Sequence, residues 1–221
     1  MTRRSAGIEP PVIAHARPRN LTDDDGRELA AGGTSELLRF TDVDVSGRDL
    51  SGSVFSECEF DALTAAGTEL QHTVIAESRL SDVYGPSLNA ARSTLRDVEI
   101  RDSRLGAVDM PDAEVQSVSV TGSKLSWVNL RGAHLRDVLF HDCVFEELDL
   151  SQARVDRVRF RDCAVSTLRL DGAQLRNADL RGLHLSAVSG IESMRGAALS
   201  PEQLGELAPI LASHLGIMIL E

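Results

Sequence analysis

Bulky apolar residues recur at every fifth position of this chain, from Phe40 to Leu185, without a slip in register. Of the 30 positions in this series, 27 hold Leu, Ile, Val, Met or Phe, and only Ala65, Gly85 and Ala90 depart from it. Hydrophobic residues make up 42% of the chain, so random placement would fill fewer than half of these positions. A helix repeats its buried face every 3.6 residues and a strand every 2, so a period of five fits neither.

A second five-residue series lies two places before the first and holds mainly small or moderately apolar residues, with Arg48 as its one large polar member. Residues two apart in an extended segment point to the same side, so each repeat sends one large and one small side chain inward and then turns. Glycines two places after the large residue fit turns with positive φ: Gly47, Gly52, Gly67, Gly122, Gly132, Gly172 and Gly182. Such repetition predicts a solenoid, in which each repeat is stable only when stacked on its neighbours.

The repeats resemble a known family. The segments 178–182 (Ala-Asp-Leu-Arg-Gly), 132–136 (Gly-Ala-His-Leu-Arg) and 172–176 (Gly-Ala-Gln-Leu-Arg) resemble the A-(D/N)-L-x-x unit of pentapeptide-repeat proteins, and the resemblance covers roughly residues 38–190. It implies an all-β solenoid, a right-handed quadrilateral β-helix with four units, and hence about 20 residues, in each coil. At roughly 4.8 Å per coil the repeats would form a rod about 36 Å long.

Two segments flank the repeats. Residues 1–37 lack the period and are rich in proline, glycine and acidic residues, which predicts an extended and partly disordered segment with a turn of helix near residues 23–31 that caps the open end of the solenoid. Residues 191–221 predict a short α-helical cap, because Ser200, Pro201 and Gln203 form a capping box with proline at the first helical position.

The C-terminal segment also predicts a homodimer. Leucines at three- and four-residue spacing form one apolar stripe on the predicted helix, with Pro209 expected to kink or divide it and Gly216 to end it. An apolar tail follows, and an exposed apolar surface of this kind indicates a partner. The candidate dimer interface consists of Leu204, Leu207, Leu211, Leu215, Ile217 and Ile219.

Composition and motifs argue against several classes of function. The net charge of −11 argues against nonspecific binding to nucleic acid, and no run of 18 apolar residues suggests a membrane span. No export signal follows Arg3 and Arg4, so we expect a cytoplasmic protein in which Cys58, Cys143 and Cys163 are buried thiols. No catalytic, cofactor-binding or metal-binding constellation is present, so we expect no enzyme and no cofactor.

Outward residues 20 apart should stack in columns, and three of these columns are acidic. The first holds Asp49, Glu69, Asp109 and Asp149, interrupted by Asn89 and Asn129. The second holds Asp42, Asp82, Asp102, Asp142 and Asp162, and the third holds Glu57, Glu77, Asp97 and Asp137. Two interpretations stay open, because Asp and Asn at turn corners accept backbone hydrogen bonds whether or not the column binds a partner.

Two functions follow from these surfaces. In the first, the chain is a non-enzymatic scaffold for a protein partner, with the outward apolar residues Trp127, Leu139 and Val144 as the candidate contact surface. In the second, which the resemblance to the Qnr/MfpA-like pentapeptide proteins implies, an acidic rod-shaped dimer imitates DNA, binds DNA gyrase or topoisomerase IV and gives quinolone resistance. Charge density weakens the second, since residues 38–190 hold 24 acidic and 17 basic side chains, far below the charge of duplex DNA.

Overall fold

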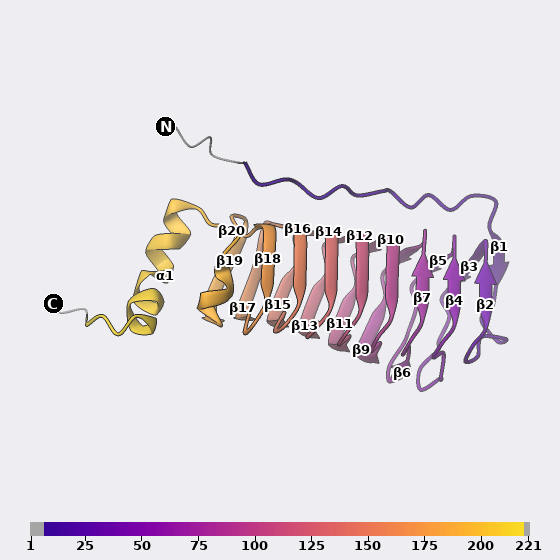
Figure 1. Cartoon of the computed structure of the whole chain (residues 1–221). Helices are drawn as coiled ribbons and strands as arrows, with labels where there is room; N and C mark the ends of the chain where they lie inside the picture. Colours follow the sequence, from indigo (N-terminus) through magenta and orange to yellow (C-terminus); the bar gives the residue numbers. More distant parts are fainter. Residues whose placement is uncertain (1–6, 219–221) are drawn as a thin grey trace.

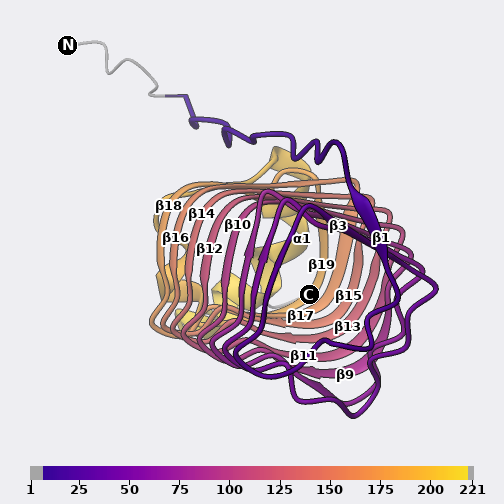
Figure 2. The same ribbon diagram turned by 90° about the vertical axis from the view of Figure 1, so that its right-hand side faces the viewer.

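The computed structural model describes residues 7–218, and its main body is a parallel β-solenoid of two sheets with one α-helix at its C-terminal end (Figure 1). Seen along its axis, the coil has a four-sided outline (Figure 2). No helix among the described residues is long and apolar enough to cross a membrane. The all-β solenoid with a short C-terminal helix is the architecture that the five-residue period predicts.

The two sheets hold 13 and seven strands. The larger, sheet A, consists of β1 (Thr22–Asp24), β2 (Thr34–Glu36), β3 (Leu38–Thr41), β4 (Val54–Ser56), β5 (Glu59–Asp61), β7 (Val74–Ala76), β8 (Arg79–Ser81), β10 (Thr94–Arg101), β12 (Glu114–Thr121), β14 (His134–His141), β16 (Arg154–Arg161), β18 (Gln174–Asp179) and β20 (Ala197–Ala198). The smaller, sheet B, consists of β6 (Thr68–Glu69), β9 (Tyr84–Asn89), β11 (Arg104–Asp109), β13 (Lys124–Asn129), β15 (Val144–Asp149), β17 (Cys163–Arg169) and β19 (Leu183–Ser189).

Register within each sheet follows the sequence period. Leu95 pairs with Val115, and Val115 pairs with Leu135, so neighbouring strands place residues 20 apart side by side. A coil of 20 residues therefore holds four five-residue units, as the resemblance implied. Each residue of one coil stacks on its counterpart in the next, and this register aligns both the core and the surface columns.

The core is the interior of the coil, filled by the two inward series. Leu135, Phe160 and Leu170 of the large series are at most 3% exposed, and the small series supplies Ala133 and Ala153 at 0%. Phe140 and Phe160, one coil apart, stack with their ring centroids 5.0 Å apart. The three cysteines, Cys58, Cys143 and Cys163, are buried as expected. Because the inward side chains of successive coils pack against one another, the core is continuous along the rod.

The corners of the coil use positive φ more widely than the glycine pattern predicts. Six of the seven expected glycines have positive φ, but so do many aspartates and other residues, such as Asp42 at 54° and Asp102 at 50°. Gly182 is the exception, because its φ lies outside this region and an added Cβ would instead lie 2.6 Å from the carbonyl oxygen of Phe160. The prediction for Gly182 was wrong in its reason, since close packing of the backbone is what requires glycine there.

Two departures from the inward series have local causes. Gly85 leaves a gap in the large series that the side chains of Leu88 and Leu105 fill, and an added Cβ would lie 3.0–3.2 Å from their atoms. Arg48 turns its guanidinium toward the chain before the first coil, where it donates hydrogen bonds to the carbonyl oxygens of Gly26, Arg27 and Leu29. The charged side chain in the small series thus ties the N-terminal segment to the solenoid.

The N-terminal segment differs from its prediction in two ways. Residues 23–31 contain turns and no helix, and the coil begins before residue 38, because β1 pairs with β3 and β2 pairs with β4. Leu29 packs against the core of the first coils, so part of the segment covers the open end as expected, whereas residues 7–19 do not. They are extended and run back along the outside of sheet A from β1 toward β18 (Figures 1 and 2). We call residues 7–19 the strap.

At the other end, a short 3-10 helix, η1 (Ile191–Met194), leads to β20 and then to α1 (Pro201–His214). The predicted capping box is present, and the helix ends where Gly216 takes a φ of 69°. The helix continues through Pro209, which therefore does not divide it. Gln203, which is 9% exposed, donates from its amide to the carbonyl oxygens of Leu180 and Leu183 and so ties the helix to the last coil.

Candidate functional site

The first acidic column forms a ladder along one edge of sheet B. Strand pairing places Asp49 beside Glu69, Glu69 beside Asn89, and so on in turn to Asp149, each rung one coil from the next. We call this column the open ladder: Asp49, Glu69, Asn89, Asp109, Asn129 and Asp149. None of its residues is buried. The open ladder is therefore a continuous polar surface on the outside of the rod.

Amide side chains separate the carboxylates of the open ladder from Glu69 to Asp149. Asn89 Nδ2 donates to Glu69 Oε2 at 2.8 Å, and Asn129 Nδ2 donates to Asp109 Oδ1 at 2.6 Å. These bonds link neighbouring coils and reduce the repulsion that stacked like charges would cause. Hydrogen bonds from the hydroxyl and backbone N–H of Ser51 lower the pKa of Asp49. Hydrogen bonds between coils and within the turn at Asp49 thus hold the rungs of the open ladder in place.

Trp127 lies on the same sheet as the open ladder and two residues before one of its rungs. Its side chain points outward from β13 and is 55% exposed, whereas Val128 points inward and Asn129 continues the ladder. Val144 on β15 is 51% exposed. Tyr84 on β9, which sequence reasoning did not single out, is 52% exposed and belongs to the same column as Val144. An aromatic residue at an outward position of the five-residue repeat was the sequence signal that could have identified Tyr84.

Leu139 does not join these residues. It lies on β14 in sheet A and is only half-buried, beside Ser119 and Arg159 of the adjoining coils. Of the apolar contact surface predicted from the sequence, the structure places Trp127 and Val144 on one sheet and Leu139 on the other. We define the ladder face as the open ladder together with Tyr84, Trp127 and Val144, all of which lie on sheet B.

The second acidic column occupies left-handed corners of the coil. Asp42, Asp82, Asp102, Asp142 and Asp162 all have φ between 50° and 54°. Aspartate is among the few residues other than glycine that adopt this conformation readily. Local backbone geometry therefore accounts for the choice of aspartate here. All five carboxylates nevertheless stay exposed.

The third column also occupies left-handed corners, but the strap covers part of it. We call it the strap column: Glu57, Glu77, Asp97, Ser117, Asp137, Arg157 and Asn177. Ser117 and Asp137 are 6% exposed, and both accept hydrogen bonds from backbone N–H groups of the strap. Arg157 forms a two-point ion pair with Asp137, with both N···O distances 2.7 Å, and this pair lowers the pKa of Asp137.

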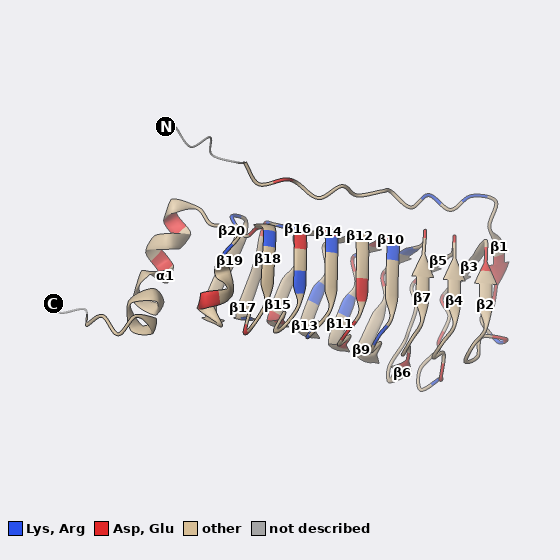
Figure 3. Ribbon diagram, viewed as in Figure 1, with Lys and Arg blue, Asp and Glu red and all other residues tan. Residues whose placement is uncertain are grey.

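On sheet A, ion pairs between coils neutralise much of the charge that lies outside the acidic columns. Arg39, Glu59, Arg79 and Glu99 alternate in sign along one column, and their N···O distances are 3.1–3.5 Å. Blue and red bands likewise alternate along β10, β12, β14, β16 and β18 (Figure 3). Sheet B has paired charges too, since Arg169 lies 2.7 Å from Glu147. In the open ladder, amides lie between the acids from Glu69 to Asp149, and an arginine, Arg169, follows only after the last rung.

The predicted dimer interface is divided between a packed part and an exposed part. Leu207 is 3% exposed and packs at the end of the rod, whereas Leu204 and Leu215 are 53% and 70% exposed. Ile217 is exposed, Leu211 is half-buried, and Ile219 lies outside the described residues. Exposed Met218 extends the apolar surface beyond the helix. One end of the molecule therefore presents apolar side chains that its own chain leaves uncovered.

Within residues 7–218 no group of three or more His, Cys, Asp or Glu side chains is arranged to hold a metal ion. The two most apolar hollows are narrow spaces between core side chains, such as the one of about 80 Å³ lined by Leu95, Phe140 and Phe145. The described surface is suited to binding a partner, through columns of charged, amide and aromatic side chains at fixed spacing.

Part of the solenoid matches a model of a known protein family. The family model described as "Pentapeptide repeat region" matches residues 113–189, which contain the whole of strands β12–β19. The matched coils and the earlier ones share the same 20-residue register. Residues 113–189 are therefore similar to the repeats of pentapeptide-repeat proteins.

Among solved structures, the chain is similar to QnrB1, described as a plasmid-mediated fluoroquinolone resistance protein. One trypsin-treated form shares 19% identity, with 94% of this chain and 99% of that chain covered and a TM-score of 0.37. Another shares 22% identity, with 90% and 95% covered and a TM-score of 0.34. No curated protein matches the sequence.

Proposed function

We propose that this protein is a non-enzymatic interaction scaffold whose ladder face binds a basic surface of a protein partner. The observation that supports the proposal most is Trp127, which is 55% exposed beside the open ladder. Large exposed aromatics are enriched at protein interfaces, where they supply most of the binding energy. Acidic rungs around such a residue favour a basic partner and speed its association.

Affinity capture with tagged full-length protein tests this proposal. We expect Trp127→Ala to lose the specific partners of the parent protein. The ladder variant Asp49→Asn, Glu69→Gln, Asp109→Asn, Asp149→Asn should lose the same partners, most clearly as salt is lowered. The matched control removes four charges elsewhere, with Asp42→Asn, Asp82→Asn, Asp102→Asn and Asp142→Asn, and asparagine tolerates those left-handed corners equally well. Equal capture by all four proteins would refute the ladder face.

A second candidate function is imitation of DNA toward DNA gyrase or topoisomerase IV. The regular rise of the open ladder favours it, because the rungs repeat at one coil, roughly 4.8 Å. Its charge density opposes it, since only four of the six rungs are acidic, whereas duplex DNA carries one charge per roughly 1.7 Å. Apolar residues exposed at the C-terminal end, including Leu204 and Leu215, would join two copies into a longer rod.

Supercoiling by purified gyrase, titrated with this protein with and without a quinolone, tests the second candidate. DNA mimicry predicts inhibition, or relief of quinolone-induced cleavage, that the ladder variant loses and the corner control keeps. Sedimentation of the parent and of Leu204→Glu with Leu215→Glu tests the dimer, which the double substitution should dissociate. If the protein changes neither supercoiling nor quinolone-induced cleavage by gyrase, DNA mimicry is refuted and only the scaffold function remains.

A further inference from the structure

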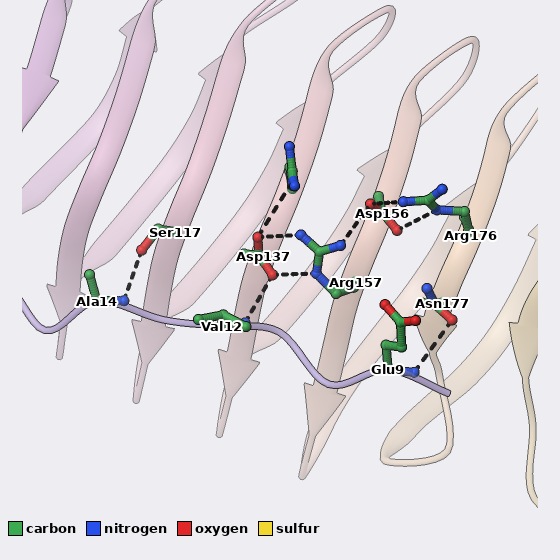
Figure 4. A network of polar contacts seen from close by, with 10 residues as sticks. Glu9, Val12, Ala14, Ser117, Asp137, Asp156, Arg157, Arg176 and Asn177 are labelled. Atoms are coloured by element: carbon green, nitrogen blue, oxygen red, sulfur yellow. Dashed lines mark hydrogen bonds and ion pairs between the residues drawn. The ribbon is translucent and has the colours of Figure 1, made fainter. Parts of the chain in front are cut away.

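The strap is bound to the solenoid through its backbone, across many coils (Figure 4). The N–H of Val12 donates to Asp137 Oδ1 at 2.9 Å, and the N–H of Ala14 donates to Ser117 Oγ at 2.9 Å. Toward the chain start, the N–H of Glu9 lies 3.4 Å from Asn177 Oδ1. Side chains of the strap column thus present acceptors to the main chain of an extended peptide.

The spacing of these acceptors matches an extended chain. Asn177 and Asp137 are two coils apart, which is about 10 Å. Glu9 and Val12 are three residues apart, and an extended or polyproline segment rises about 3.1–3.3 Å per residue, so it spans about the same distance. Because backbone groups make these contacts, the column recognises an extended conformation more than a particular sequence.

Prolines stiffen the strap without removing any of these donors. Pro10 and Pro11 lie between Glu9 and Val12, where neither replaces a residue whose N–H donates to the column. Pro18 lies beyond Ala14, the last strap residue whose N–H donates to the column. Proline favours the extended polyproline conformation and lowers the entropy that a peptide loses on binding. The placement of proline is what a preorganised peptide ligand requires.

Charge on the strap complements the acidic part of the column. Arg17 and His15 line a hollow of about 150 Å³ together with Glu57, Glu77 and Asp97. Arg79 Nη2 also donates to the carbonyl oxygen of Ala16 at 3.2 Å. The N-terminal half of the strap column therefore faces a basic segment.

Little apolar burial holds the strap in place. Ala16 is 5% exposed, but Val12 is 70% exposed and most of the remaining strap side chains are exposed or half-buried. Segments with few buried apolar contacts open at a small fraction of the global unfolding free energy. The strap thus combines specific polar contacts with the weak anchoring of a segment that can detach while the coils stay folded.

We propose that the strap column is a binding site for extended, basic peptide segments of partner proteins, and that the strap is its resident competitor. Partner binding at this column requires the strap to detach. The site is separate from the ladder face, which lies on the other sheet, so failure of one proposal leaves the other standing.

Peptide binding by the full-length protein tests the proposal. The probe is a fluorescein-labelled synthetic peptide of residues 7–19, measured by anisotropy. In the variant Val12→Pro, Ala14→Pro the strap lacks the two N–H groups that form its 2.9 Å hydrogen bonds to the column. Because its strap then competes less strongly for the column, the variant should bind the probe at least tenfold more tightly than the parent does. His15→Pro is the matched control, because the His15 N–H makes no hydrogen bond in the structure, and it should behave as the parent does. Equal affinity for all three proteins would overturn the proposal.

Native-state hydrogen exchange of the parent gives a second test that needs no variant. The N–H groups of Val12 and Ala14 should exchange at least 100-fold faster than those of Leu130 and Leu150, which are bonded within the coils. Exchange of the strap amides only at the rate of global unfolding would show that the strap is a fixed part of the fold, and would overturn the proposal.

Discussion

The open ladder and the strap column have the same 20-residue spacing and a similar acidic content, but they have different surroundings. Asp137 of the strap column is 6% exposed, accepts the Val12 N–H and pairs with Arg157. Asp109 of the open ladder is exposed, and its neighbour Asn129 contributes an amide. Sequence period determines which residues stack. The side chains between the acids determine whether a column is neutralised within the fold or left free to bind.

The largest expected effect comes from changes that disrupt both columns at once. Leu135→Asp or Phe160→Asp places a charge in the core, where these side chains are 2% and 3% exposed, and should lower the free energy of unfolding by more than about 3 kcal/mol. Chemical denaturation measures this. Gln116→Asp is the control, since Gln116 is exposed between Arg96 and Arg136. Parental stability in either core variant would refute the register.

A smaller effect should separate the two columns. Arg157→Leu leaves Asp137 mostly buried without its ion-pair partner, because the two side chains are 13% and 9% exposed. We expect a loss of about 2–3 kcal/mol, somewhat below the range for fully buried pairs. Arg131→Leu removes an exposed arginine next to the open ladder and should change stability by less than about 0.5 kcal/mol. Equal losses in the two variants would remove the distinction between the columns.

Acid should reduce the difference between the parent and a variant of this ion pair. The hydrogen bonds from Arg157 lower the pKa of Asp137, against the opposing effect of its burial, and the Val12 N–H lowers it further. A depressed folded-state pKa stabilises the protein above the unfolded value of about 3.9, and this stabilisation is lost as the pH falls through the folded-state pKa.

Denaturation of the parent and of Arg157→Gln at a series of pH values measures this effect. The stability difference should be constant at and above about pH 5 and decrease below the ordinary carboxyl pKa. A difference that keeps its full size in strong acid would contradict the assigned role of Asp137.

The smallest effect on stability is expected for the open ladder. Replacing its four acids by their amides removes repulsion between coils but keeps acceptors for the neighbouring N–H groups, so the free energy of unfolding should change by less than about 1 kcal/mol in total. Thermal and chemical denaturation of the ladder variant measure this. A large loss of stability would show that the ladder serves the fold, and the scaffold proposal would then lose its main support.

Much of the fold could be predicted from the sequence, because a five-residue period over 30 units is a repeated local signal. The acidic columns could be predicted for the same reason, as could the capping box at Ser200. Contacts that depend on distant segments could not. The strap bonds Glu9 to Asn177, 168 residues away, and Gln203 covers carbonyls of a coil 20 and 23 residues earlier. Neither pairing recurs, so no period reveals it.

The candidate site shows the same division. Asn89 and Asn129 interrupt the acidic series in sequence, but the hydrogen bonds that they donate to Glu69 and Asp109 depend on side-chain geometry. Leu139 looked equivalent to Val144 as an outward apolar residue, and only the placement of the two strands in different sheets separates them. Periodicity assigns residues to columns, whereas tertiary contacts decide what each column does.

Carboxyl footprinting of the native protein tests the difference between the two columns most directly. Carbodiimide-activated amidation, followed by mass spectrometry, reads the accessibility of every Asp and Glu in one experiment. Asp109 of the open ladder is exposed and the Asp137 side chain of the strap column is 9% exposed. The structure predicts that Asp109 is modified at least tenfold faster than Asp137, and that this difference disappears on unfolding. Equal rates in the native protein would contradict it.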